Sequence, residues 1–361
     1  MAAAIVVVLD VLLAQVYKLA GPEWRTTDYH YRVKSALYDH DLATDVETEG
    51  VSGGIHFPVR TNNLGFRDAN VRKVSLRNDA FRLVFIGDSF TEGIGVPYED
   101  TFVGIIAEHL KSEGIEVLNA AVSSYSPAIY YRKIKYLIEK VGLEFDELIV
   151  FVDISDVEDE ALYYALDDQE NVVRLRPPAN PPSLVRTVKT FLKENSVAVR
   201  FGDLLKDKLI SSWNPPDAIG SMRDRAMWTG DNVLFARYGE LGLRKARRNM
   251  DRLLRLLCRH NVDLTIVVYP WPHQIISHDL HSLQVKYWRA WAEENEVEFL
   301  NLFPLFITGE NESAIIANYF IPGNVHWNTN GHRLVADAFL TYSSRNRRAA
   351  EPKRYRESTC E

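Results

Sequence analysis

Residues 83–93 read Leu-Val-Phe-Ile-Gly-Asp-Ser-Phe-Thr-Glu-Gly, an apolar run that passes directly into a polar loop. A short apolar run followed by a turn signal is typical of a strand that is buried on both faces, as in a parallel sheet. Residues 101–113 follow with apolar side chains at helical spacing. Because open α/β sheets bind ligands beyond the carboxyl ends of their strands, the loop that carries Ser89 is a candidate functional site.

The same alternation continues along the chain. Further apolar runs predict strands at 115–118, 148–152, 264–268 and 297–300, and helical spacing predicts helices at 128–141, 241–260, 282–294 and 328–341. Alternating strands and helices predict the α/β class, with a parallel sheet between two layers of helices. The loops that follow the strands then surround one crevice.

The chain of 361 residues is long enough for one large α/β domain with insertions. We assign this domain to residues 81–345, after a polar, irregular N-terminal extension at 21–80. The alternation breaks at 168–238, where proline pairs flank a basic amphipathic stretch, and we interpret this segment as a helical lid insertion. Residues 346–361 form a short basic tail that we expect to be flexible.

The N-terminal residues 2–20 are apolar apart from three polar side chains, with Asp10 near the middle. Two interpretations remain open. Residues 1–20 form a membrane anchor, although an acidic side chain at the bilayer centre costs about 2.5–3.5 kcal/mol; the protein would then lie at the cell membrane or in the periplasm of a bacterium. Alternatively, the helix packs on the domain through Leu12, Leu13 and Val16.

Composition excludes several classes of function. The net charge of −7 does not suggest a nucleic-acid partner. The two cysteines, Cys258 and Cys360, make neither a disulfide framework nor a zinc motif, and we expect Cys258 to be a core residue. No glycine-rich phosphate loop is present, so a flavin or nucleotide site is not expected. We therefore expect no metal and no cofactor; composition does not define the oligomeric state.

Two residues suggest serine chemistry. Ser89 lies between a buried strand and a helix, where unpaired N–H groups of the first helical turn face outward. His326, in the segment Gly323-Asn324-Val325-His326-Trp327, directly precedes the last helix and is placed to reach that loop. Taken singly, each has a simpler explanation: Asp88 or Ser89 caps a helix, and His326 caps a helix or lies at the edge of the core.

Four loops together resemble the SGNH (GDSL-like) hydrolase superfamily, of the membrane-associated or exported bacterial type. Gly87-Asp88-Ser89 follows the first strand, residues 119–124 follow the second, residues 153–156 follow the third, and His326 precedes the last helix. The order and placement of these loops are specific, although each motif alone is not. The resemblance covers residues 80–345.

The resemblance implies a three-layer, flavodoxin-like α/β/α fold and ester chemistry without a cofactor. Ser89 would attack an acyl carbonyl, and His326 would act as the general base. The oxyanion would be held by the N–H of Ser89, an N–H near Ser124 and the side chain of Ser155. The expected oxyanion and substrate-binding set is completed by Asp88, Asn119, Trp271 and Trp327.

The sequence departs from the family pattern at three positions. Ser124 stands where a glycine is expected, and Ser155 stands where an asparagine is expected. Asn324 lies where related sequences have an aspartate before the histidine. An asparagine oxygen accepts a hydrogen bond from the His326 ring but does not stabilise imidazolium by charge. An active Ser–His enzyme, a weakly active one and a binding protein on a hydrolase fold all remain open.

Aromatic and acidic residues flank the expected crevice. Trp271, in the loop 269–273, and Trp327 either stack on a sugar ring or seal the core. The acidic cluster at 153–160 is interpreted as a solvated helix start and not as a metal site. Residues 61–68 also resemble a segment that precedes the catalytic domain in some bacterial members, with no mechanism assigned.

We therefore predict a serine esterase that acts on a small-molecule or glycan ester, with an O-acetyl group on a glycan as the favoured substrate. An O-acyltransferase that acts on a glycan and a non-catalytic glycan-binding protein are the alternatives.

Overall fold

The computed structural model describes residues 9–16, 31–52, 55–77, 79–175, 196–199, 218–309 and 311–347. Its centre is a five-stranded parallel sheet with the strand order β11-β10-β7-β5-β6. The strands are β5 (Arg82–Ile86), β6 (Glu116–Asn119), β7 (Glu147–Val152), β10 (Asp263–Val268) and β11 (Glu298–Asn301). In chain order this is the 2-1-3-4-5 arrangement of flavodoxin-like folds. The predicted α/β class and all five predicted strands are confirmed.

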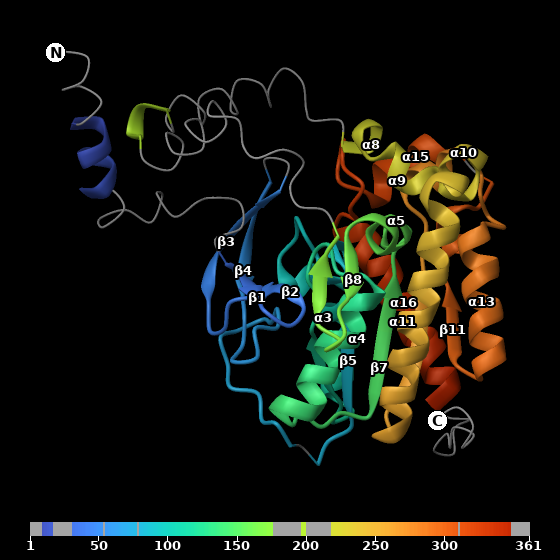
Figure 1. Cartoon of the computed structure of the whole chain (residues 1–361), viewed down its shortest axis with the longest axis horizontal. Coiled ribbons are helices and arrows are strands. Elements are labelled where there is room, and N and C mark those ends of the chain that lie inside the picture. Colours follow the sequence, from blue (N-terminus) through green and yellow to red (C-terminus); the bar gives the residue numbers. More distant parts are fainter. Residues whose placement is uncertain are drawn as a thin grey trace.

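Long helices cover both faces of this sheet (Figure 1). One layer contains α3 (Phe102–Lys111) packed on α16 (Thr329–Arg347). The other contains α4 (Pro127–Tyr136), α11 (Glu240–Arg259) and α13 (Leu283–Asn295), with α11 packed on α4 and hydrogen-bonded to α13 through the Tyr287 hydroxyl and the Leu243 carbonyl. This division follows from right-handed crossovers, since only the connection from β5 to β6 runs in the opposite direction along the sheet.

Shorter helices occupy the connections. Near the strand ends are α2 (Ser89–Glu92), η2 (Tyr98–Asp100) and α5 (Asp156–Leu162), and η3 (Leu137–Val141) extends α4. The connection before α11 contains α8 (Ala218–Ser221), α9 (Arg223–Ala226), η4 (Met227–Thr229), α10 (Asn232–Leu234) and η5 (Phe235–Gly239). Towards the C-terminus lie α12 (Pro272–Ile276), α14 (Phe303–Phe306) and α15 (Glu312–Tyr319).

The N-terminal extension is more regular than its sequence predicts. It contains two antiparallel hairpins, β1 (Arg32–Ser35) with β2 (Asp39–Leu42), and β3 (Glu47–Ser52) with β4 (Ile55–Arg60). Figure 1 shows them on the side of the molecule opposite α11 and α13. The prediction of an irregular segment was wrong because these strands are short, polar and half exposed, so they lack the apolar runs that mark a buried strand.

A third hairpin, formed by β8 (Tyr164–Leu166) and β9 (Val172–Arg174), spans the predicted start of the insertion at residue 168. Residues 176–195 and 200–217, which hold most of the predicted basic amphipathic stretch, lie outside the described residues. Residues 348–361, most of the predicted tail, also lie outside them. The lid assignment stays a prediction for those ranges.

Residues 9–16 are helical, whereas the rest of the predicted anchor lies outside the described residues. Leu12, Leu13 and Val16 are 57%, 49% and 59% exposed, so the alternative in which they pack inward is wrong. Within the described ranges, no helix is both long and apolar enough to span a membrane. Cys258 is buried in α11, as predicted.

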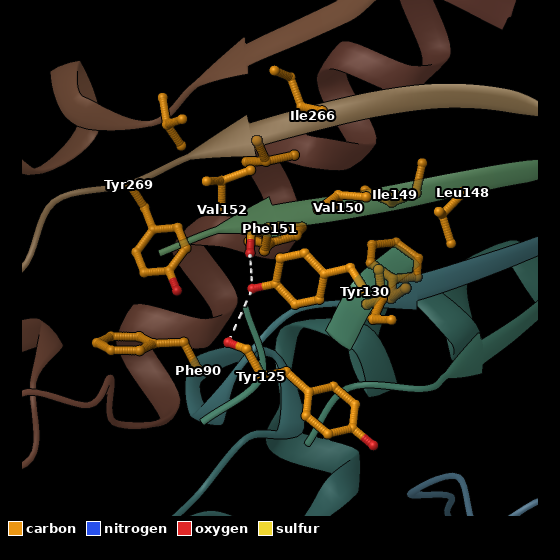
Figure 2. Packing of buried hydrophobic residues seen from close by; sticks show 14 of the residues in the cluster. Phe90, Tyr125, Tyr130, Leu148, Ile149, Val150, Phe151, Val152, Ile266 and Tyr269 are labelled. Carbon is orange, nitrogen blue, oxygen red and sulfur yellow. Dashed lines mark hydrogen bonds between the residues drawn. The ribbon is translucent and has the colours of Figure 1, made fainter. Parts of the chain in front are cut away.

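The core lies on both faces of β7, whose residues Leu148–Val152 are fully buried. Figure 2 shows Tyr130 of α4 below the carboxyl end of this strand, with its hydroxyl oxygen 3.4 Å from the carbonyl oxygens of Phe151 and Tyr125. The shortest contact of this hydroxyl, at 3.0 Å, is to Asp156 Oδ2. Tyr269 and Phe90 lie nearby, with ring centroids 5.0 Å apart. This packing fixes the end of the sheet at which the loops meet.

Candidate active site

Ser89 is the first residue of α2, directly beyond the carboxyl end of β5, and its residue exposure is 9%. Asp88 caps this helix, since its carboxylate accepts from the Phe90 N–H at 3.0 Å. A side chain on Gly87 would place its Cβ 2.3 Å from Thr91 Oγ1. Only glycine therefore allows the tight passage from strand to helix that presents the Ser89 side chain at the end of the sheet.

His326 brings the end of the chain to this serine. Its Nε2 lies 2.8 Å from Ser89 Oγ, and its Nδ1 lies 2.8 Å from Asn324 Oδ1. The three side chains thus form a continuous Ser–His–Asn chain of hydrogen bonds. The residues come from the two ends of the α/β domain and meet because the segment before α16 lies at the carboxyl end of β5, an internal strand of the sheet.

The backbone fixes the orientation of the Asn324 amide. The His326 N–H donates to Asn324 Oδ1 at 3.3 Å, alongside the ring contact. An amide rotated by half a turn would direct its own N–H groups at this donor, so the oxygen must face His326. The ring then carries its proton on Nδ1, which leaves Nε2 as the acceptor for the Ser89 hydroxyl. This is the tautomer that a general base requires.

Burial keeps the His326 ring neutral. Loss of solvent contact lowers the pKa of His326 from its usual 6.5 to about 4. No carboxylate accompanies the ring to oppose this effect, since Asn324 takes that place. At neutral pH the imidazole is therefore free to accept a proton from Ser89.

Asp88 is a second neighbour of the Ser89 hydroxyl, with Oδ2 3.2 Å from Ser89 Oγ. The hydroxyl has one proton to donate, and the shorter contact is the one to His326. Burial, together with the nearby charge of Asp153, raises the pKa of Asp88 well above its usual range. A neutral carboxyl is a weaker acceptor than a carboxylate, so Asp88 does not divert the Ser89 proton from His326.

The three residues border a cavity of about 360 Å³. Ser124 and Ser155, the two expected oxyanion residues beyond β6 and β7, line it together with Asp88 and Trp271. Within the described ranges, the N–H groups of Ser89 and Ser124 donate to no other protein atom. The cavity therefore presents two unused backbone donors, the arrangement that stabilises a developing oxyanion.

A buried carboxylate anchors the side of the cavity formed by Trp271 and Ser155. Asp153 Oδ2 accepts from the Tyr269 hydroxyl at 2.7 Å and from Trp271 Nε1 at 2.6 Å, and its Oδ1 accepts from the Ser155 N–H at 2.7 Å. Asp156 lies next to it, and burial with the charge of Asp153 raises the pKa of Asp156 well above its usual range. The interpretation of this cluster as a solvated helix start was wrong, because Asp153, Asp156, Asp159 and Glu160 are all buried.

Two of the predicted site residues lie outside the cavity. Asn119 is fully buried; its amide donates to the Thr91 carbonyl at 2.8 Å, and its oxygen accepts from the Ala121 N–H at 3.1 Å. It ties the loop after β6 to α2, and it does not line the cavity. Trp327 is also fully buried, among Phe90, Phe102, Tyr269 and Phe306, so it seals the core and does not stack on a substrate.

Several cavity residues carry no sequence signal. Ser52 reaches the cavity from the β3–β4 hairpin, Met222 and Arg225 reach it from the insertion, and Ile321 and Pro322 lie before the histidine. Single residues on irregular segments have no periodicity that could mark them. Among the described residues, no group of histidine, cysteine or acidic side chains is arranged to hold a metal ion.

The segment at 61–68, which had no assigned mechanism, has a structural role. Arg67 is fully buried and donates to the carbonyls of Glu92, Gly93 and Val96, at 2.7 Å for Glu92. These carbonyls belong to the turn that ends α2. Arg67 thus fixes the far end of the helix that carries the nucleophile.

No protein-family model matches the chain, and no curated protein matches it. Among solved structures, it is similar to a psychrotrophic esterase from Pseudoalteromonas sp. (12% identity, 74% of this chain and 98% of that one, TM-score 0.41). It is also similar to an acetyl xylan esterase (14%, 73% and 99%, 0.42) and to a lipolytic protein of the G-D-S-L family from Veillonella parvula (14%, 74% and 100%, 0.40). Similarity at this level carries no functional argument, so function is inferred from the geometry around Ser89.

Proposed function

We propose that this chain is a serine esterase with Ser89 as its nucleophile, His326 as its general base and Asn324 as the group that orients the base. The observation that supports this most directly is the pair of 2.8 Å contacts that His326 makes, one from each ring nitrogen. A half-buried histidine with a purely structural role does not require a hydrogen bond to a serine hydroxyl that lines a cavity. Two unused backbone donors beside that hydroxyl complete the requirements of acyl transfer.

The reaction follows from these positions. Ser89 Oγ attacks the acyl carbonyl carbon while its proton passes to His326 Nε2. The carbonyl oxygen becomes an oxyanion that the N–H groups of Ser89 and Ser124 receive. The C–O bond to the alcohol then breaks, and the alcohol leaves with the proton from Nε2. Water, activated by the same nitrogen, releases the acid and restores Ser89.

The cavity indicates the size of the acyl group. Its volume of about 360 Å³ is at the low end for small-molecule sites. Its lining includes five serines and the Asn324 amide, together with six apolar residues. A short acyl group such as acetyl fits this space, and a polar alcohol suits the hydroxyl-rich lining.

Reaction with a fluorophosphonate tests the proposal without knowledge of the substrate. We expect a covalent adduct on Ser89 in the wild type, located by peptide mass mapping, and its loss in Ser89→Ala and His326→Ala. Ser112→Ala is the matched control, because Ser112 is an exposed serine at the end of α3. Hydrolysis of p-nitrophenyl acetate should exceed that of the octanoate ester and disappear with the adduct.

A folded wild-type protein that forms no adduct would overturn this proposal. It would instead favour the alternative in which the cavity binds an ester or a glycan without reacting. Glycan binding that survives Ser89→Ala would then be the positive observation for that alternative.

A further inference from the structure

The loop that contains Ser124 is held from outside the α/β domain. His40, on β2 of the N-terminal extension, places its ring Nε2 2.8 Å from the carbonyl oxygen of Ser123. A carbonyl only accepts hydrogen bonds, so Nε2 carries the proton and donates. Ser123 and Ser124 both line the cavity, whereas His40 does not, so the Ser123 carbonyl is bonded to a residue outside the cavity lining.

The backbone N–H of Ser123 is also hydrogen-bonded. The Ser123 N–H donates to Glu92 Oε2 at 2.6 Å, and Arg32 Nη2 donates to both oxygens of this carboxylate at 2.8 Å. Glu92 is 1% exposed and belongs to α2. Ser123 is thus hydrogen-bonded through both of its backbone groups. Its N–H is bonded to the helix that carries Ser89, and its carbonyl is bonded to the N-terminal extension.

These two hydrogen bonds at Ser123 determine the direction of the Ser124 N–H. The chain contains no cis peptide among its described residues, so the Ser123 carbonyl and the Ser124 N–H point in opposite directions. Ser124 also adopts the left-handed conformation, with φ of 67°, which a serine rarely takes without support. A carbonyl drawn towards His40 leaves the Ser124 N–H pointing the other way, towards the cavity.

We propose that His40 is a positioning residue of the oxyanion site: it holds the Ser123–Ser124 peptide in the orientation that aims the Ser124 N–H at the reacting carbonyl. This inference rests on the proposed esterase function. Without the hydrogen bond from Nε2, the peptide is free to rotate and the site loses one of its two backbone donors.

The His40 ring is itself held by a charged relay. Its Nδ1 lies 2.7 Å from Asp39 Oδ2, and Arg174 of β9 makes two further bonds to the Asp39 carboxylate, each 2.7 Å. Burial opposes the charge on Asp39, but the hydrogen bonds from His40 and Arg174 outweigh it and hold the pKa of Asp39 below its usual range. Both ring nitrogens therefore face hydrogen-bond acceptors.

The test compares two substitutions at one position. His40→Phe keeps an aromatic ring beside Tyr125, whose centroid lies 5.1 Å from that of His40, but removes the donor. His40→Gln places an amide N–H where Nε2 was. We expect kcat for p-nitrophenyl acetate to fall about 100-fold or more in His40→Phe, as when an oxyanion donor is lost, with little change in KM. His40→Gln should recover most of the loss.

A transition-state analogue separates this role from a structural one. The inhibition constant of a trifluoromethyl ketone, which forms a tetrahedral adduct on serine, should rise in His40→Phe by the factor by which kcat/KM falls. His56→Phe, on the exposed part of β4, is the control and should change neither. If His40→Phe does not fold, Asp39→Asn, which keeps the ring but removes its charged partner, should lower kcat several-fold at constant KM.

The two proposals fail in different ways. If Ser89→Ala is inactive but kcat is unchanged in a folded His40→Phe, the positioning role is overturned. The same holds for an unchanged kcat in Asp39→Asn where that variant replaces His40→Phe. Full activity in Ser89→Ala would overturn the esterase proposal itself. A loss of kcat that His40→Gln does not relieve would also contradict the inference, because it would show that the donor is not what matters.

Discussion

Replacement of Asn324 by aspartate isolates the contribution of charge to this site. The new carboxylate would lie where the amide oxygen is now, 2.8 Å from His326 Nδ1. An opposite charge at this range raises a histidine pKa by about one to three pH units, from about 4 to between about 5 and 7 here. Each unit corresponds to about 1.4 kcal/mol, so imidazolium would gain about 1.4–4 kcal/mol.

Only part of this stabilisation of imidazolium contributes to kcat. A transition state in which about half of the imidazolium charge has formed would gain about 0.7–2 kcal/mol, which raises kcat about 3- to 30-fold. The dependence of kcat/KM on pH separates the change in rate from the change in the pKa of His326, because its acidic limb reports the pKa of the base in the free enzyme. The folded pKa of His326 is lowered in the wild type, so the active neutral form persists down to about pH 4.

The expected profiles therefore cross. Asn324→Asp should be faster than the wild type at pH 8 and should lose its activity at a higher pH as the solution is acidified. Asn330→Asp adds the same charge at an exposed position near the start of α16 and should leave the limb in place. Coincident acidic limbs in the wild type and in Asn324→Asp would refute the reasoning, since the limb would then not report His326.

Two further predictions concern stability, measured by urea unfolding. Ser124→Gly should stabilise the protein by up to about 1 kcal/mol, because glycine adopts the φ of 67° at this position without the penalty that other residues pay; a destabilised variant would contradict the assignment of strain. Arg67→Leu should cost at least about 3 kcal/mol, since several buried carbonyls lose their donor at about 1–3 kcal/mol each. Arg77→Leu, at an exposed position, should change stability by less than about 0.5 kcal/mol and is its control.

The sheet could be predicted from the sequence because its strands are buried on both faces. Runs such as Leu148–Val152 have no polar interruption, and the long helices between them show one apolar face. The same principle explains what was missed. The strands β1 to β4 carry mixed side chains on half-exposed surfaces, so their apolar residues show neither the helical nor the strand periodicity. Their pairing depends on contacts with the α/β domain, such as that between Arg32 and Glu92.

Within the site, the sequence predicted residues whose role follows from their place at a strand end. Ser89, Ser124, Ser155 and Asp88 are brought to the cavity in this way. Asn119 follows the same logic and Trp327 adjoins His326, yet both side chains point into the protein. Strand-end placement fixes a backbone position and not the direction of a side chain, so burial could not be predicted for them.

In the proposed mechanism, two of the three departures from the family pattern, at Asn324 and Ser155, have a common consequence. Asn324 orients the base but adds no charge, and the Ser155 hydroxyl has a shorter reach than the amide expected there. Both losses shift the stabilisation of the transition state onto the backbone donors at Ser89 and Ser124. The N–H of Ser89 is fixed by the start of α2, whereas that of Ser124 lies in an exposed loop. The contacts that Ser123 makes with Glu92 and His40 therefore matter more here than they would beside a charged triad. A site that relies on one loop peptide needs that peptide held firmly, and the N-terminal extension is the part of the chain that holds it.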